Sequence, residues 1–253
     1  MTLFNLMGLI STVALSLPII ALLTTKLAWY RSFPALFFYY LIVVSYNLLL
    51  LGYFKIDGNF RYYHGVMNNL LDTPLMLSFL LYFSKTQAFR KKLLTVIAGF
   101  AAFEVIIIAM YGFTAKATTI ILAPGLLITL IVSSLFFIHQ VKIAVVYHKA
   151  IGKAIMAASL LFAYVGYCFV YAVFYIIQPV FKDDAHLVFF LITIFSSIAL
   201  SAGILLERKR VRQLIELKTT REELKAIYGE QQVKKRANPF EAAALNFDKE
   251  QWN

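Results

Sequence analysis

The chain has 253 residues, of which 61% are hydrophobic and only 15% are charged, and its mean hydropathy is +0.76. Soluble domains are roughly half apolar and a quarter charged, so this composition excludes a soluble globular protein and indicates an integral membrane protein. The net charge of +11 does not indicate a nucleic-acid partner, because the basic residues separate apolar runs and gather toward the C-terminal end. A single cysteine, Cys168, excludes a disulfide bond within the chain.

Seven apolar runs are long enough to cross a bilayer, which takes about 20 helical residues, and runs of this length exclude barrel strands. The first run has no basic residues before it, so we expect a retained span and not a cleaved signal peptide. The longest predicted break is HQVKIAVVYHKAIGK, residues 139–153. The sequence predicts an all-α seven-transmembrane-helix bundle over residues 1–206, with spans near 3–25, 34–54, 64–83, 93–113, 118–138, 154–177 and 187–206.

The distribution of lysine and arginine predicts the orientation of the bundle, since cytoplasmic loops are enriched in both. Nine lie in the loops after the first, third and fifth spans and eleven in the segment that begins at Arg208, against four in the other loops. We therefore expect the N-terminus outside and the C-terminus in the cytoplasm, in a multi-pass protein of a cytoplasmic (inner) membrane. An interfacial aromatic belt is expected at Trp29, Tyr30, Tyr62 and Tyr63.

A layer of polar residues is predicted in the outer half of the bundle. Asp72 and Glu104 each lie eight residues below the outer end of their span, or about 12 Å at the rise of an α-helix. A carboxylate in a membrane helix costs roughly 2.5–3.5 kcal/mol on insertion scales, which makes both acids candidates for a functional site. Their equal depth on adjacent helices is what a shared ligand site would require. The other predicted ligand-binding residues are Asn47, Asn68, Asn69, Tyr164, Tyr167 and Tyr171.

Two prolines within spans, Pro74 and Pro124, are predicted hinges, because proline lacks the amide hydrogen that a helix interior uses. Together these groups predict a pocket that opens outward and takes a small molecule, a lipid or a proton. The alternative is structural, since amides, hydroxyls and aromatic rings in membrane bundles often only hold helices together. Under that reading Glu104 would pair with Asp72 and share a proton with it.

Missing residues exclude several cofactors. A retinal Schiff base needs a lysine midway along the last span, and residues 186–206 contain none. Buried bis-histidine haem is not expected, since all four histidines fall at span ends or in loops. No metal site is predicted; His64 and His186, at the same outer surface, are the residues from which one could be built. No Walker loop, HExxH or GxSxG motif is present, so no cofactor is expected and an enzyme is not favoured.

After the last span, residues 207–235 predict a helix that continues into the cytoplasm, with apolar residues about every 3.5 positions, as in a short coiled coil. Packing on the cytoplasmic loops or on anionic lipid is the alternative, and ERKR (residues 207–210) is interpreted as a positive-inside anchor. Residues 236–253 predict a docking segment whose helix starts at Asn238-Pro239. The predicted partner-binding residues are Leu214, Leu217, Leu224, Ile227, Phe240 and Phe247.

Seven spans followed by a helical extension resemble the heptahelical sensor modules of bacteria that precede signalling domains. This resemblance is one of architecture; it implies a sensor role and assigns no site residues. The first hypothesis is a sensor or receptor-like protein, in which a pocket around Asp72 signals to a cytoplasmic or membrane protein partner. An accessory subunit of a larger membrane assembly is the second hypothesis. A small-molecule or proton-coupled carrier is the third, and the lack of repeated halves weakens it.

Overall fold

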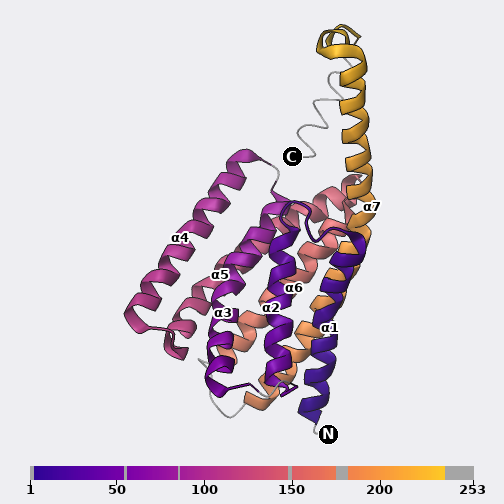
Figure 1. Ribbon diagram of the computed structural model, residues 1–253. Helices are drawn as coiled ribbons and strands as arrows, with labels where there is room; N and C mark the ends of the chain where they lie inside the picture. The colour runs from indigo at the N-terminus through magenta and orange to yellow at the C-terminus, as the bar shows by residue number, and fades with distance from the viewer. Residues whose placement is uncertain (1–2, 54–55, 85, 148–149, 175–181, 237–253) are drawn as a thin grey trace.

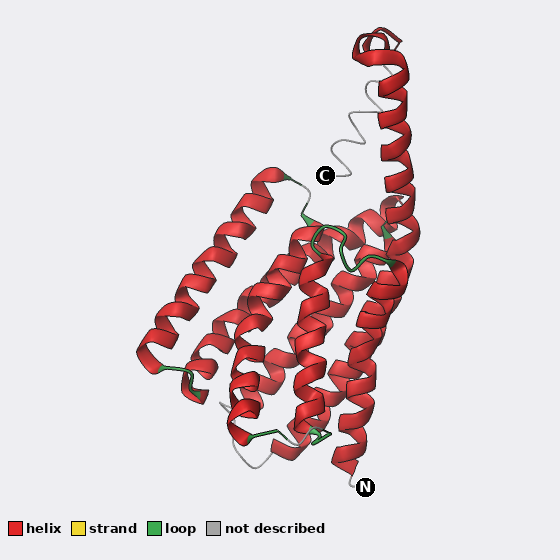
Figure 2. Ribbon diagram, viewed as in Figure 1, coloured by secondary structure: helices red, strands yellow, loops and turns green. Residues whose placement is uncertain are grey.

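The computed structural model describes residues 3–53, 56–84, 86–147, 150–174 and 182–236. Every regular element in these ranges is helical (Figure 2). A short 3₁₀ helix, η1 (Leu81–Phe83), follows the third α-helix. The α-helices are α1 (Leu3–Thr25), α2 (Phe33–Leu50), α3 (Gly58–Leu80), α4 (Gln87–Tyr111), α5 (Ala115–Tyr147), α6 (Ile151–Ala172) and α7 (Lys182–Arg236).

Six of the described helices, α1, α2 and α4 to α7, contain a stretch long and apolar enough to cross a bilayer. The chain is therefore a multi-pass membrane helix bundle, as its composition predicted. Although α3 has 23 residues, it is not among the six. Its hydropathy is lowered by the polar residues Arg61, His64, Asn68, Asn69 and Asp72.

The helices form a closed ring with one helix outside it. Within the ring, α1 packs on α2, α2 on α3, α3 on α5, α5 on α6, α6 on α7, and α7 back on α1. The remaining helix, α4, packs on α3 and α5, and it lies at the edge of the molecule (Figure 1). The polar helix α3 is thus flanked by protein on three sides, which explains how it carries amides and a carboxylate through the bundle.

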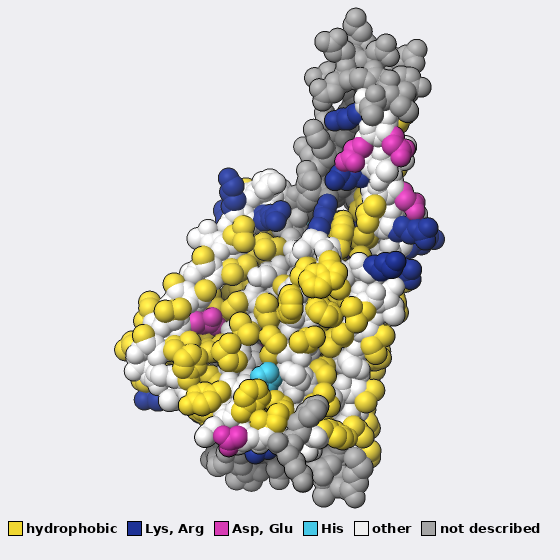
Figure 3. Space-filling view, viewed as in Figure 1, with side chains coloured by type: hydrophobic (Ala, Val, Ile, Leu, Met, Phe, Trp, Pro, Cys, Tyr) yellow, Lys and Arg dark blue, Asp and Glu magenta, His cyan; other side chains and the backbone are white. Residues whose placement is uncertain are grey.

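The two ends of the bundle differ. The last part of α7 projects well beyond the other helices, and we call this end of the bundle the extension end (Figure 1). The N-terminus of the chain lies at the opposite end. Lysine and arginine side chains gather around the extension end and along the projecting helix (Figure 3).

An aromatic cluster closes the interior near the extension end. The Phe33 ring lies 5.4 Å from that of Phe79 and 4.7 Å from that of Tyr82, between ring centroids. The Phe83 ring lies 5.7 Å from that of Phe136 on α5. All five side chains are buried. This cluster joins α2, the end of α3 and α5 in one apolar core.

Local sequence signals explain several helix boundaries. Pro34 stands in the first turn of α2, where its missing amide hydrogen is not needed. The Thr86 hydroxyl caps α4 by accepting a hydrogen bond from the Phe89 amide at 3.2 Å. The same helix ends at Gly112, whose φ of +67° favours glycine and whose amide donates to the Ile108 carbonyl at 2.7 Å.

The predicted break at residues 139–153 is wrong for most of its length, because α5 continues without interruption to Tyr147. The physical reason is that residues 126–151 contain neither glycine nor proline, so nothing in this stretch ends a helix. The predicted starts of the third and fourth spans, at residues 64 and 93, are also late. The helices begin at Gly58 and Gln87, because charged and polar residues in their first turns face solvent without opposing helix formation.

Two glycines let α6 and α7 approach closely. A Cβ atom added to Gly152 would lie 2.7 Å from the Glu207 amide nitrogen and 2.9 Å from the Gly203 carbonyl oxygen. A Cβ atom added to Gly203 would lie 2.9 Å from the Met156 amide nitrogen. Because these neighbours are backbone atoms, a larger side chain cannot be accommodated by a rotamer change. Small residues at such contacts are a common basis of helix association in membranes.

We expect Gly152→Ala to reduce the free energy of unfolding in detergent by about 1–3 kcal/mol, as overpacking generally does. The matched control is Gly99→Ala on α4, since a Cβ atom there meets nothing within 4 Å. That control should be neutral or stabilise the helix by about 0.5–1 kcal/mol. Equal effects of the two substitutions on unfolding would contradict the close α6–α7 contact.

Candidate functional site

Asp72 points into the interior of the helix ring. Its carboxylate oxygens lie 3.4 and 3.5 Å from the Tyr164 hydroxyl on α6, which donates to them. Tyr164 is 1% exposed and Tyr39, on α2, is 8% exposed. The Tyr39 hydroxyl also interacts with the Asp72 carboxyl. Side chains from α2 and α6 therefore meet at the Asp72 carboxyl group of α3.

A second tyrosine extends this cluster to α7. The Tyr167 ring lies 5.8 Å from that of Tyr164, edge to face. Its hydroxyl is 3.4 Å from the Thr193 hydroxyl on α7. The third predicted tyrosine, Tyr171, instead donates to the Thr119 carbonyl of α5 at 3.2 Å. Two members of the tyrosine stripe thus connect Asp72 to α7, and the third binds α5.

Glu104 lies on α4, outside the ring, and its side chain is buried beside Phe100 at the contact with α3 and α5. Its Oε1 atom is buried and has no hydrogen-bond partner among the described residues. Within these residues no hydrogen bond joins it to Asp72, although the two carboxyl groups are close enough to interact electrostatically. The two acids therefore lie on neighbouring helices as predicted, but Asp72 is paired with a tyrosine of α6.

The three predicted amides lie in different surroundings. Asn47 donates to the Val43 carbonyl of its own helix at 2.9 Å, which is the structural alternative foreseen for such residues. The Asn68 Oδ1 atom is buried without a hydrogen-bond partner in the described part of the chain. Asn69 lines an open cavity together with Tyr46, Arg61, Tyr62 and Thr118.

This cavity has a volume of about 350 Å³ and lies between α2, α3 and the start of α5, at the end opposite the extension. His64 lies near it on α3, with its Nε2 atom 2.9 Å from the Ser45 hydroxyl. The other histidine considered as a metal ligand, His186, packs its ring 4.8 Å from that of Phe174. The described residues contain no group of three or more side chains able to hold a metal ion.

The predicted hinges lie within continuous helices. Pro74 is inside α3 and Pro124 is inside α5. Next to the second proline, Gly125 faces Thr73 of α3 so closely that an added Cβ atom would clash with the threonine side chain. The crossing of α3 and α5 thus brings both prolines to one level, and their role as hinges stays a prediction.

The predicted partner-binding residues are described only in part. Leu214 is half-buried, while Leu217 and Leu224 are 53% and 45% exposed on the projecting part of α7. The side chain of Ile227 and the whole of Phe240 and Phe247 lie outside the described residues. The coiled-coil and docking predictions remain untested.

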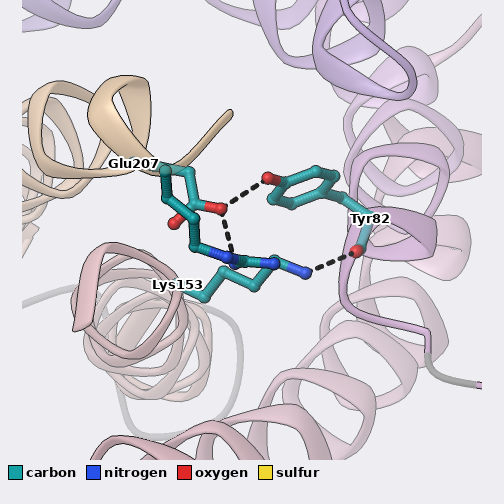
Figure 4. A network of polar contacts seen from close by, with 4 residues as sticks. Tyr82, Lys153 and Glu207 are labelled. Atoms are coloured by element: carbon teal, nitrogen blue, oxygen red, sulfur yellow. Dashed lines mark hydrogen bonds and ion pairs between the residues drawn. The ribbon is translucent and has the colours of Figure 1, made fainter. Parts of the chain in front are cut away.

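A second polar cluster, which sequence reasoning missed, lies where α7 leaves the bundle (Figure 4). Glu207 is 1% exposed, and its Oε1 atom accepts hydrogen bonds from the Tyr82 hydroxyl at 2.6 Å and from Arg210 at 2.7 Å. The Lys153 ammonium group lies 4.4 Å from the centroid of the Tyr82 ring and 3.5 Å from the Tyr82 carbonyl oxygen. This cluster joins the end of α3 to the start of α6 and to α7.

The sequence contained a signal for this cluster. Glu207 is the only acid in the basic run ERKR, and it follows directly on an apolar span. The interpretation of residues 207–210 as a positive-inside anchor assigned no separate role to Glu207. An acid at the end of an apolar stretch with arginine three positions later suggests an internal ion pair, but no local pattern identifies Tyr82 as the third member.

Comparison of the chain with protein-family models, with curated proteins and with solved structures found no match.

We expect Tyr82→Phe to reduce the free energy of unfolding in detergent by about 1–3 kcal/mol, since it takes one hydrogen bond from a buried carboxylate. The control is Tyr63→Phe, because the Tyr63 side chain is 56% exposed and lies at the opposite end of the bundle. Denaturant titration of both purified variants measures the difference. A loss of the same size in the control would show that the Glu207 contact does not stabilise the fold.

Proposed function

We propose that this chain is a heptahelical membrane sensor or receptor-like protein. A ligand enters a polar pocket at the outer end of the bundle, and the resulting change around Asp72 reaches a cytoplasmic partner through the extension of α7. The observation that carries the proposal is the line of contacts from Asp72 through Tyr164 and Tyr167 to Thr193 on α7. No cofactor and no catalytic residue is part of it.

The seven-span arrangement is supported by the surroundings of α3. Although its hydropathy is low, α3 packs against α2, α4 and α5. Its length of 23 residues corresponds to about 35 Å of helix, enough to cross the hydrocarbon core. Polar side chains on a spanning helix are tolerated when they face protein. With α3 counted, the excess of basic residues at the extension end favours a cytoplasmic location for that end.

The entry point in this proposal is the cavity lined by Asn69, which opens at the end opposite the extension. Asp72 lies one helical turn further into the bundle on the same helix. Its long contacts with the Tyr164 hydroxyl, 3.4 and 3.5 Å, are near the upper limit of a hydrogen bond. A ligand that binds the Asp72 carboxylate or the Tyr164 hydroxyl therefore has only a weak contact to displace. A weak contact allows α3 and α6 to move relative to one another when the ligand binds.

Transmission in this proposal depends on α7, a single helix of 55 residues from the outer end of the bundle to the far end of the extension. A shift of the α7 segment near Thr193 would be carried along the helix axis to Glu207. There the hydrogen bond from the Tyr82 hydroxyl holds Glu207, and with it α7, against the end of α3. Coupling between two sites requires an element with two alternative arrangements. In this proposal that element is the contact between Glu207 and Tyr82.

The accessory-subunit and carrier hypotheses make different demands on the same residues. An accessory subunit would keep its partner after Asp72→Asn and lose it when residues 207–253 are removed. A carrier would show solute flux in proteoliposomes that depends on Asp72. A sensor needs both Asp72 and the extension, and it needs no flux.

Labelling with a membrane-impermeant maleimide tests the number of spans and the orientation. With Cys168→Ala as background, we expect Asp57→Cys to react in intact cells, and Gln87→Cys and Thr219→Cys to react only after permeabilisation. Asp57 directly precedes α3, and Gln87 begins α4 after the connection that follows α3, so they are separated by the membrane only if α3 crosses it. Reaction of both from the same side would overturn the seven-span arrangement.

Spin-label distances test the coupling directly. In the Cys168→Ala background, labels at Lys91→Cys on α4 and Thr219→Cys on α7 report the position of the extension relative to the bundle. We expect Asp72→Asn to shift the distance distribution by about 1–2 Å or to add a second population, as small helix shifts do.

The control for this experiment is Asp57→Asn, which changes an exposed acid at the opposite end of the bundle and should leave the distribution unchanged. Tyr164→Phe should act in the same direction as Asp72→Asn, because it removes the other half of the contact. Distributions identical to wild type in both variants would contradict transmission from Asp72 to α7.

A further inference from the structure

A second cavity, at the extension end, is lined by positively charged and hydrogen-bonding side chains, of which only Tyr82 also belongs to the cluster around Glu207. It has a volume of about 280 Å³ and lies where the α1–α2 connection meets the α3–α4 connection. Arg31 contributes from the first connection and Arg90 from the first turn of α4. None of the lining residues is acidic.

Neither Arg31 nor Arg90 forms an ion pair with a carboxylate of the described residues. The guanidinium carbon of Arg31 lies 5.4 Å from the centroid of the Tyr30 ring, a contact that leaves its hydrogen-bond donors available. Arg31 also has a φ of +48°, an uncommon conformation for a residue other than glycine. Two unpaired guanidinium groups at one cavity make it strongly attractive to an anion.

Smaller donors complete the lining. Ser32 makes no capping hydrogen bond at the start of α2. The Thr86 hydroxyl accepts from the Phe89 amide and so keeps its own hydrogen for a ligand. The Gln87 side-chain amide also lines the cavity. The two guanidinium groups and the neutral donors approach the cavity from several directions. Such an arrangement suits an anion with more than two acceptor oxygens better than a carboxylate, which has two.

We propose that the cavity between Arg31 and Arg90 binds a phosphate group. Arginine pairs with phosphate through two parallel hydrogen bonds, and two arginines match the double charge of a phosphate monoester. The volume, about 280 Å³, is at the lower end of the range for small-molecule sites, so it takes a single phosphate with its nearest atoms. The source is either a lipid headgroup such as that of phosphatidic acid or a free phosphate.

The position of the cavity explains what such a ligand would touch. Tyr82 lines the cavity and also donates its hydroxyl to Glu207. A phosphate bound beside Tyr82 would therefore lie next to the contact that holds α7 to the end of α3. The phosphate site does not depend on the sensor role. Of its lining residues, only Tyr82 takes part in a contact that the sensor proposal uses.

Native mass spectrometry of the full chain in neutral detergent tests the site, with short-chain phosphatidic acid and inorganic phosphate as separate probes. We expect wild type to bind, and Arg31→Gln/Arg90→Gln to raise the dissociation constant by at least about tenfold. The matched control, Lys91→Gln/Lys92→Gln, removes the same charge from the same end of α4 without touching the cavity, and its affinity should stay within about twofold of wild type.

The two probes separate the sources. Binding of phosphatidic acid alone identifies a headgroup site, and binding of inorganic phosphate with the same dependence on the arginines identifies a site for free phosphate. No binding of either probe by wild type, or equal losses in the two double variants, would overturn the proposal. If the glutamine variant does not fold, Arg31→Lys/Arg90→Lys decides, because it keeps the charge and removes the forks; wild-type affinity there would also overturn it.

Discussion

An ionised carboxyl group among apolar side chains is stabilised by hydrogen-bond donors that the protein supplies, and such donors join distant helices at Asp72 and at Glu207. Asp72 accepts from Tyr164, 92 residues later in the chain, and Glu207 accepts from Tyr82, 125 residues earlier. Burying an ionised group without such a partner would cost several kcal/mol. Each pair therefore joins helices that are distant in sequence, and the position of α3 relative to α6 and α7 depends on the two pairs together.

The α6–α7 pair has contacts along much of its length. Near the extension end, Gly152 and Gly203 allow backbone contact. In the middle, the Ser159 hydroxyl donates to the Ser196 carbonyl at 2.6 Å, and further along Tyr167 reaches Thr193. Contacts of this kind favour movement of α6 and α7 as one unit. A change at Tyr164 would then be passed to the extension by displacement of the pair and would not require sliding of one helix along the other.

Because α4 lies outside the ring, Glu104 and Asp72 have different surroundings. Glu104 lies at the contact with α3 and α5, beside Phe100, whereas Asp72 is directed to the ring interior. At the other end of α4, Arg90 in its first turn and Thr86 just before it line the cavity at the extension end.

The sequence by itself determined the helical class, the membrane location and the approximate position of most helices, because hydropathy and helix-breaking residues act over a few turns of one segment. It also identified Asp72 and the tyrosines of α6 as polar groups within apolar spans, since an acid or a phenol in an apolar run is visible without any partner. Only the tertiary structure decided which groups meet. The pairing of Asp72 with Tyr164, the ring that leaves α4 outside, and the joining of Tyr82 to Glu207 all depend on the order in which helices pack side by side. That order is set by the summed fit of many side chains across different helices, and no single segment of the chain carries it.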